Sequence, residues 1–151
     1  MIDGVVVKPL QVHADDRGYL MEVLREDDPL FERFGQAYVT CAYPGRVKAW
    51  HAHQRQTDHL CCVAGTVKLG LYDDREDSPT RGETAAVVMG LVQPGLVRIP
   101  PGVWHGFVAL GGEPAVVLNL PNLPYDYQAP DERRRDPFDP TIPFTWLTRG
   151  G

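Results

Sequence analysis

Apolar and polar residues alternate in short runs along most of the chain, with turn residues between the runs. Turns recur at roughly 8–12-residue intervals, a spacing typical of an all-β sandwich or barrel. The pattern predicts strands at residues 5–12, 19–24, 36–42, 47–53, 60–64, 66–73, 84–89, 95–99, 104–110 and 115–120. One short helical turn is expected at 27–34, where Asp28 can serve as the cap and Pro29 as the first helical residue.

The rest of the chain is predicted to be loop. Residues 74–83 are charged and contain Pro and Gly, which indicates a surface loop. From Pro121 onward the alternation stops, so we expect an irregular, Pro-rich segment that continues to the end. Fifteen Gly and 14 Pro argue against a helical bundle. A length of 151 residues suits one domain, at 1–151, that can bury a core without disulfides or metals as staples.

Charge and cysteine content narrow the class of protein. A formal net charge of −5 favours neither nucleic acid nor an anionic membrane as a partner. No apolar run approaches the roughly 20 residues of a membrane span, and Asp3 interrupts the place where a signal peptide would begin. Three cysteines, with Cys61 and Cys62 adjacent, do not form a disulfide framework. We therefore expect a reduced, cytoplasmic protein.

The candidate chemistry lies between Gly45 and Gly65. Five residues separate Gly45 from His51, one separates His51 from His53, and four separate His53 from Asp58. Residues two apart in a strand point to the same face, so His51 and His53 should lie side by side. A turn and a returning strand could bring Asp58 opposite them.

A second segment, Ile99-Pro-Pro-Gly-Val-Trp-His-Gly-Phe107, could supply a third imidazole from His105. Imidazoles and a carboxylate that converge on one pocket suit either proton transfer or metal ligation. The two segments together resemble the paired signature motifs of the cupin superfamily, which are small antiparallel β-barrels of the jelly-roll type. Asp58 stands where many cupins have Glu, and Ala109 stands where they often have Asn. The resemblance implies one all-β jelly-roll domain.

Within the cupins, the chain resembles the sugar-nucleotide 3,5-epimerases that act on dTDP-4-keto-6-deoxyglucose. Segments 15–22, 73–82, 99–107 and 139–146 carry the resemblance. It implies an isomerase of deoxysugar biosynthesis that binds a nucleotide sugar and needs no cofactor. It also implies a homodimer, because the N-terminal strands resemble those that the epimerases exchange between subunits.

The resemblance assigns roles to individual residues. His51 falls on the catalytic base, which takes a proton from the carbon next to the keto group. Asp139 falls on the carboxylate that orients this base, and Tyr125 is the closest match to the catalytic acid. A pKa near 7 suits a base at neutral pH, and a carboxylate partner fixes its tautomer.

Five further residues are expected to bind substrate. His105 and Lys48 would hold the sugar, with His53 beside them, and Arg17 and Gln36 would hold the nucleotide. Some positions depart from the epimerases. Lys48 stands where they have Arg, Asp58 where they have Lys, and Tyr38 where they have Asn.

These departures leave other interpretations open. His51-Ala52-His53 also resembles the proton-shuttling pair of the sugar-nucleotide 3,4-ketoisomerases. Alternatively, His51, His53, Asp58 and His105 hold a divalent transition metal such as Fe, Mn, Ni, Co or Zn. A non-catalytic cupin that binds a sugar or an effector is the remaining possibility.

Overall fold

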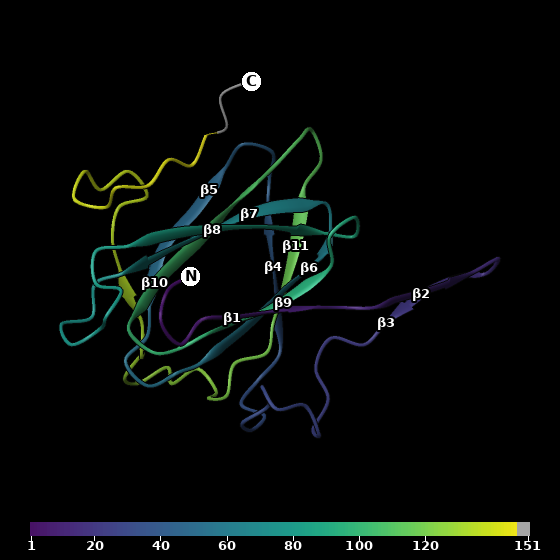
Figure 1. Cartoon of the computed structure of the whole chain (residues 1–151), viewed down its shortest axis with the longest axis horizontal. Coiled ribbons are helices and arrows are strands. Elements are labelled where there is room, and N and C mark those ends of the chain that lie inside the picture. The colour runs from purple at the N-terminus through teal and green to yellow at the C-terminus, as the bar shows by residue number, and fades with distance from the viewer. Residues whose placement is uncertain (148–151) are drawn as a thin grey trace.

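The computed structural model describes residues 1–147 and contains no helix among them. Two five-stranded sheets, antiparallel throughout, form a sandwich (Figure 1). The first sheet has the order β1 (Val6–Pro9), β9 (Gly95–Ile99), β6 (Asp58–Ala64), β11 (Ala115–Asn119) and β4 (Tyr38–Ala42). The second has the order β12 (Arg133–Arg134), β5 (Val47–Ala52), β10 (Val103–Ala109), β7 (Thr66–Asp73) and β8 (Thr84–Gly90). The predicted all-β sandwich is confirmed.

Alternate residues of the strands belong to two different apolar clusters, as a period of two requires. In β7, Val67, Leu69 and Leu71 join the main core with residues of the first sheet, whereas Tyr72 does not. Tyr72 instead packs in a second cluster, which contains Trp50, Trp104, Ile142 and Trp146. The C-terminal segment therefore covers one face of the second sheet, and the other face is left for the core and the site.

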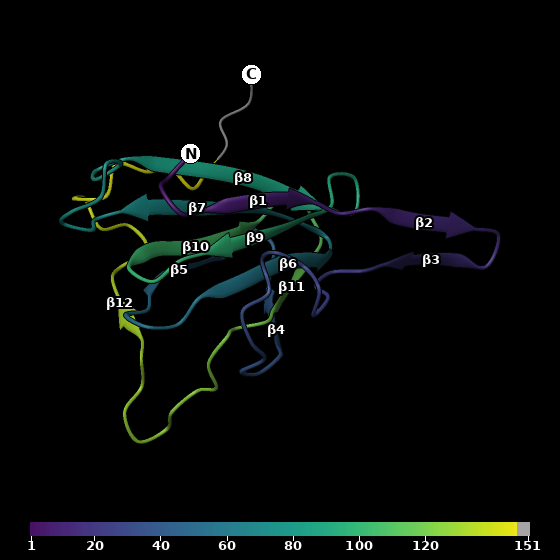
Figure 2. The same ribbon diagram turned by 60° about the horizontal axis from the view of Figure 1, so that its bottom comes forward.

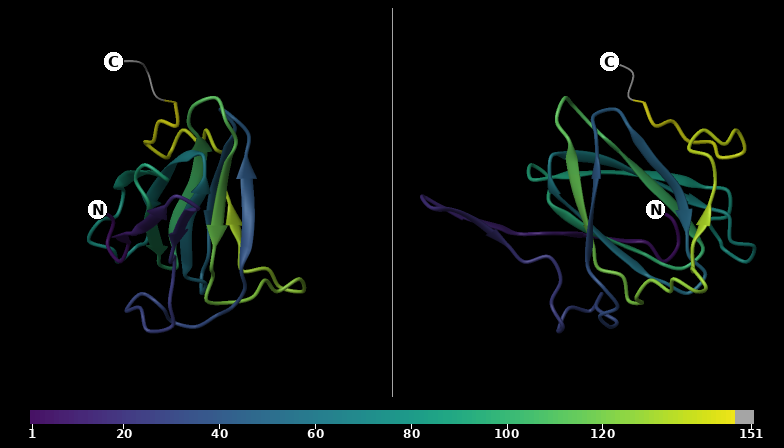
Figure 3. Two further views of the ribbon diagram at one scale, coloured as in Figure 1. Left: turned by 90° about the vertical axis from the view of Figure 1, so that its right-hand side faces the viewer. Right: turned by 180° about the vertical axis from the view of Figure 1, so that it is seen from behind.

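An N-terminal arm projects from the sandwich (Figures 2 and 3). It consists of β2 (Val12–Asp15) and β3 (Gly18–Met21), which pair only with each other. The single strand expected at 5–12 is thus two strands, because the ladder between β1 and β9 ends where Pro9 lies opposite Gly95. The side chains of Tyr19 and Leu20 are exposed on the arm.

One local prediction is wrong, and another holds except at one two-residue strand. Residues 26–30 form turns and residues 31–34 have no regular structure, so the expected helical turn is absent, and Asp28 accepts from the backbone N–H of Leu30 at 2.9 Å. So short a segment cannot offset the cost of nucleating a helix.

Within 1–147, no helix is long and apolar enough to cross a membrane. The C-terminal segment is irregular except for β12, which pairs with β5 through Arg133↔Ala52 and Arg134↔His51.

Gly106 lets β10 lie close to β5. A Cβ at this position would come within 2.2 Å of the Ala49 Cβ and 2.7 Å of the Lys48 carbonyl oxygen. Only glycine fits this approach without moving backbone. The close packing holds β5 and β10, which carry His51 and His105, against each other.

Candidate active site

His51 and His105 are direct cross-strand partners on β5 and β10. Such pairs have Cβ atoms about 4.5–5.5 Å apart. Both line a cavity of about 260 Å³, here called the inner cavity, to which the second sheet also contributes Lys48. The first sheet contributes Tyr38, Thr40, Leu60 and Asn119. The cavity also includes His53, so the expected convergence of three imidazoles is present in the structure.

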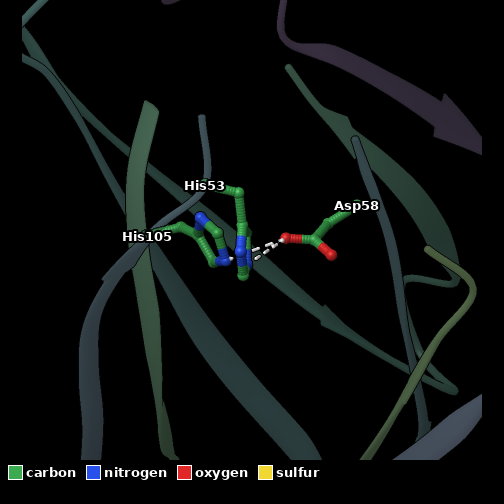
Figure 4. Close-up of side chains that lie close together, drawn as sticks. All are labelled: His53, Asp58 and His105. Carbon is green, nitrogen blue, oxygen red and sulfur yellow. Dashed lines mark ion pairs between the residues drawn. The ribbon is translucent and has the colours of Figure 1, made fainter. Parts of the chain in front are cut away.

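Asp58 joins two of these imidazoles (Figure 4). Its Oδ2 lies 3.2 Å from His53 Nε2 and 3.2 Å from His105 Nε2. Its Oδ1 accepts hydrogen bonds from the side-chain amides of Gln56 and Asn119, both at 2.8 Å. The Asp58 side chain is only 1% exposed, so this buried carboxylate has its polar contacts met by four partners.

The contacts of the Nδ1 atoms of His53 and His105 show where the protons of these two rings lie. His53 Nδ1 lies 2.5 Å from the carbonyl oxygen of Asp131, and His105 Nδ1 lies 3.1 Å from that of Val103. A carbonyl oxygen only accepts, so both Nδ1 atoms carry hydrogen. Each Nε2 then has two options, which are to donate a second proton to Asp58 or to offer a lone pair to a shared cation.

When no cation is present, the directions of the pKa shifts of His53 and Asp58 favour an imidazolium paired with a carboxylate. Burial alone would lower the pKa of His53, but the hydrogen bond and charge of Asp58 raise it above its ordinary value. Burial alone would raise the pKa of Asp58, but hydrogen bonds from His105 and His53 hold it far below its usual range. Asp58 therefore favours the protonated, imidazolium form of His53.

His51 has a different partner from the expected one. Its Nδ1 lies 3.0 Å from Oε1 of Glu132, whose Oε2 accepts from the Arg134 guanidinium at 2.7 and 2.9 Å. Asp139, which was expected to orient His51, instead accepts from the backbone and hydroxyl of Thr141 at 2.9 and 2.6 Å. That prediction is wrong because Asp139 caps a local turn and β12 places Glu132 beside His51.

The hydrogen bond to Glu132 leaves His51 able to accept a proton. Glu132 holds the hydrogen on Nδ1, so the lone pair of Nε2 is available. Burial and the electrostatic effect of the neighbouring His105 ring lower the pKa of His51, and together they outweigh the raising effect of Glu132. His51 is therefore neutral at pH 7.

Replacing Glu132 with Gln should lower the pKa of His51 further, because the carboxylate charge that raises it is lost. A pH titration of the His51 ring by NMR measures this shift. Asp139→Asn is the matched control and should leave that pKa unchanged. A shift in the control, with none in Glu132→Gln, would restore Asp139 as the partner of His51.

The remaining expected residues lie in three places. Lys48 reaches the inner cavity and donates to the Thr40 hydroxyl at 2.5 Å. Gln36 and Tyr125 line a neighbouring outer cavity of about 460 Å³, in which Tyr125 and Tyr127 make a T-shaped contact. The two cavities share Tyr38, His53, Glu132 and Arg134 as walls. Arg17 lies at the turn of the N-terminal arm, where its guanidinium donates a hydrogen bond to the Asp15 carboxylate. It lines neither cavity.

Sequence reasoning missed Glu132, Asp131 and the contacts of Tyr38. The Asp131 carboxylate accepts from the backbone N–H groups of Gln54, Arg55 and Gln56, each at 3.0 Å, and so shapes the loop after His53. The sequence signal was weak, since an acidic pair beside three arginines is typical of a solvated surface. Pairing across about 80 positions of chain gives these residues their place.

Comparisons with known proteins find relatives that match almost the whole chain. The family model described as dTDP-4-dehydrorhamnose 3,5-epimerase matches residues 1–150. The spore coat polysaccharide biosynthesis protein SpsL of Bacillus subtilis is 45% identical over 148 residues, covering 98% of each chain. A "Probable low-salt glycan biosynthesis epimerase" of Haloferax volcanii is 47% identical over 135 residues, covering 88% of this chain and 86% of that protein.

A solved structure is also similar throughout. The crystal structure of a dTDP sugar isomerase from Desulfovibrio desulfuricans superposes with a TM-score of 0.91. It is 37% identical and covers 96% of this chain and 92% of that one. The similarity therefore spans both sheets and the residues between them.

Proposed function

The chain belongs to the dTDP-4-dehydrorhamnose 3,5-epimerase family, a family of isomerases, and from this premise we propose that it epimerises a dTDP-4-keto-6-deoxy sugar. The reaction removes a proton beside the keto group and returns it on the other face. One observation carries the proposal. His51 is held by Glu132 with its Nε2 free, and it lies beside its cross-strand partner His105 in the inner cavity.

The residues of the inner cavity have different roles in this reaction. His51 Nε2 takes the proton, and the electron pair moves onto the keto oxygen as an enolate. Lys48 and His105 hold the sugar, and the charge of Lys48 favours the developing oxyanion. Where the related epimerases carry a Lys, this chain has Asp58, but Asp58 raises the pKa of the adjacent His53, whose protonated ring would supply a positive charge there.

The outer cavity suits the nucleotide. Gln36, Arg55, Arg134 and Tyr125 line it, and they offer guanidinium groups for a diphosphate and an aromatic face for a base. Its contact with the inner cavity through His53 and Glu132 would let one substrate occupy both.

We also propose a homodimer in which the N-terminal arm of one subunit reaches the site of the other. The arm makes no sheet contact within its own chain beyond its own hairpin, and the side chain of Arg17 is 85% exposed at its tip. Arg17 would then meet the diphosphate in the partner's outer cavity. Sedimentation should give the mass of two chains, and a monomer at micromolar concentration would contradict this assembly.

Two broader expectations accompany the proposal. Residues 1–151 would act as one domain, although 148–151 lie outside the described residues. The cytoplasm stays the proposed compartment, in agreement with cysteines 41, 61 and 62 being free thiols.

The reaction is tested with dTDP-4-keto-6-deoxyglucose in D₂O. Deuterium should enter a carbon beside the keto group, and a new stereoisomer should accumulate, as followed by NMR. A product with the keto group moved to the neighbouring carbon would indicate a ketoisomerase instead. Neither exchange nor product, at enzyme concentrations that saturate substrate binding, would contradict the proposal for this substrate.

A metal-dependent activity is a second candidate, favoured by the geometry of His53, Asp58 and His105. Their donor atoms lie within 4.8 Å of one another. Two ligands about 2.1 Å from one ion, at angles near those of tetrahedral or octahedral sites, lie about 3.0–3.4 Å apart. The observed 3.2 Å separations fit, and the Nδ1–H groups bonded to carbonyls are typical of metal-bound histidine. A bound ion would supply Lewis-acid polarisation of an oxygen.

The metal question has a direct test. Only three of the four expected ligands come together, because His51 lies outside this group. Protein purified without chelator or nickel resin should hold about one equivalent of a transition metal under the second candidate. Asp58→Ala should lose that metal, and His51→Asn should keep it. Less than about 0.1 equivalent in the wild type would contradict this candidate.

A further inference from the structure

Inversion at a carbon requires a base on one side and a proton donor on the other. The inner cavity lies between the two sheets, and His51 belongs to the second. Its counterpart should therefore come from the first sheet, which contributes Tyr38, Thr40, Leu60 and Asn119 to the cavity.

Only one of these four side chains is a suitable acid. Leu60 has no acidic proton. The Asn119 amide is engaged, since its Nδ2 donates to Asp58 and to the Tyr38 hydroxyl, and amides do not give up protons near neutral pH. The Thr40 hydroxyl accepts from Lys48, and an aliphatic alcohol is a far weaker acid than a phenol. Tyr38 carries the remaining proton.

The contacts of Tyr38 leave its proton available. Its oxygen accepts from Asn119 Nδ2 at 2.9 Å, so its own O–H is free to point elsewhere. Burial and the negative charge of Asp58 raise the pKa of Tyr38, which keeps the phenol protonated at neutral pH. Tyr38 also lines the outer cavity, which gives it a route to solvent.

We propose that Tyr38 is the catalytic acid of the epimerisation, an inference that rests on the proposed function. His51 Nε2 takes the proton as the C–H bond breaks, and the electron pair forms the enolate. The enolate carbon then takes the proton of the Tyr38 O–H from the opposite face, which forms the new C–H bond. The Tyr38 phenolate regains a proton from water through the outer cavity, and the His51 imidazolium releases its proton to water.

Tyr125, which was the acid expected from the sequence, lies in a different position. It lines the outer cavity and is not among the residues of the inner cavity that contains His51. Its ring packs against Tyr127 with 5.0 Å between centroids. A role in holding the nucleotide fits this position.

The experiment compares exchange with inversion in Tyr38→Phe, using dTDP-4-keto-6-deoxyglucose in D₂O. His51 can still remove the proton and return deuterium to the same face, so exchange should stay within about tenfold of wild type. Epimer formation should fall about 10²–10⁴-fold, the usual contribution of a general acid. A purely structural role would lower both rates together and leave their ratio unchanged.

Matched variants complete the test. Tyr43→Phe alters an exposed tyrosine that lines neither cavity and should behave as wild type. Tyr125→Phe should raise KM with the ratio of exchange to inversion unchanged. Normal inversion by Tyr38→Phe, an equal loss of exchange and inversion, or a selective loss of inversion in Tyr125→Phe would each overturn the assignment. A wild type that neither exchanges nor inverts overturns the proposed function itself, which distinguishes the two failures.

Discussion

Changing His51 to Asn is expected to lower both deuterium exchange and epimer formation by about 10²–10⁴-fold, since it removes the base. Asn keeps a polar side chain of similar reach, so the cavity should survive. Unlike Tyr38→Phe, this variant should lose both activities by the same factor. NMR of the product in D₂O measures both rates, and Tyr43→Phe, at an exposed position that lines neither cavity, is the control.

The pH dependence follows from the same residue. Only neutral His51 can accept the proton, so kcat/KM should fall on the acid side of its pKa. That pKa lies below the ordinary 6.5, so the rate should be level near pH 7 and fall below pH 6.5. Glu132→Gln should move this acid limb to lower pH. Exchange by His51→Asn within tenfold of wild type, with an unchanged acid limb, would assign the base to another group.

Changing Asp58 to Ala is expected to cost about 3–5 kcal/mol of folding free energy, the usual effect of removing one partner of a buried ion pair. The change leaves His53 and His105 without an acceptor at Nε2, and Gln56 and Asn119 without one at their amides. For a domain of this size, each kcal/mol moves Tm by roughly 2–4 °C, so Tm should fall by roughly 6–20 °C.

The stability difference should itself depend on pH. The pKa of His53 is raised, so its contribution is complete below 6.5 and is lost as pH rises through the raised value. The pKa of Asp58 is lowered, so its contribution is present above 3.8 and is lost as pH falls through the lowered value. The gap in Tm between wild type and Asp58→Ala should therefore be widest between pH 4 and 6.5 and narrower at pH 9.

Asp77→Ala is the control, because Asp77 is exposed in the loop between β7 and β8 and should change stability by less than about 0.5 kcal/mol. Thermal unfolding followed by circular dichroism across this pH range measures both variants. A Tm for Asp58→Ala within 2 °C of wild type at pH 6 would show that the buried pair contributes nothing to folding.

Local patterns were enough to predict much of this protein. A period of two is a property of a few neighbouring residues, so the strands of both sheets other than β12 could be predicted from the sequence, although β1 and β2 were expected as one strand. The same alternation, together with the turn before His105, predicted that imidazoles from separate strands would meet. The identity of the family followed from motifs at fixed spacing, which survive in sequence whatever the tertiary contacts.

Only the tertiary structure decided which groups those imidazoles meet. Glu132 lies 81 positions from His51, and no local rule connects them until β12 pairs with β5. The bridging of two imidazoles by Asp58, and the position of Tyr38 on the wall opposite His51, likewise depend on how one sheet packs over the other. Strand register and sheet packing depend on residues far apart in the chain, whereas the alternation of apolar and polar residues is local. The sequence therefore predicted the local part of the site, and only the fold showed which distant residues complete it.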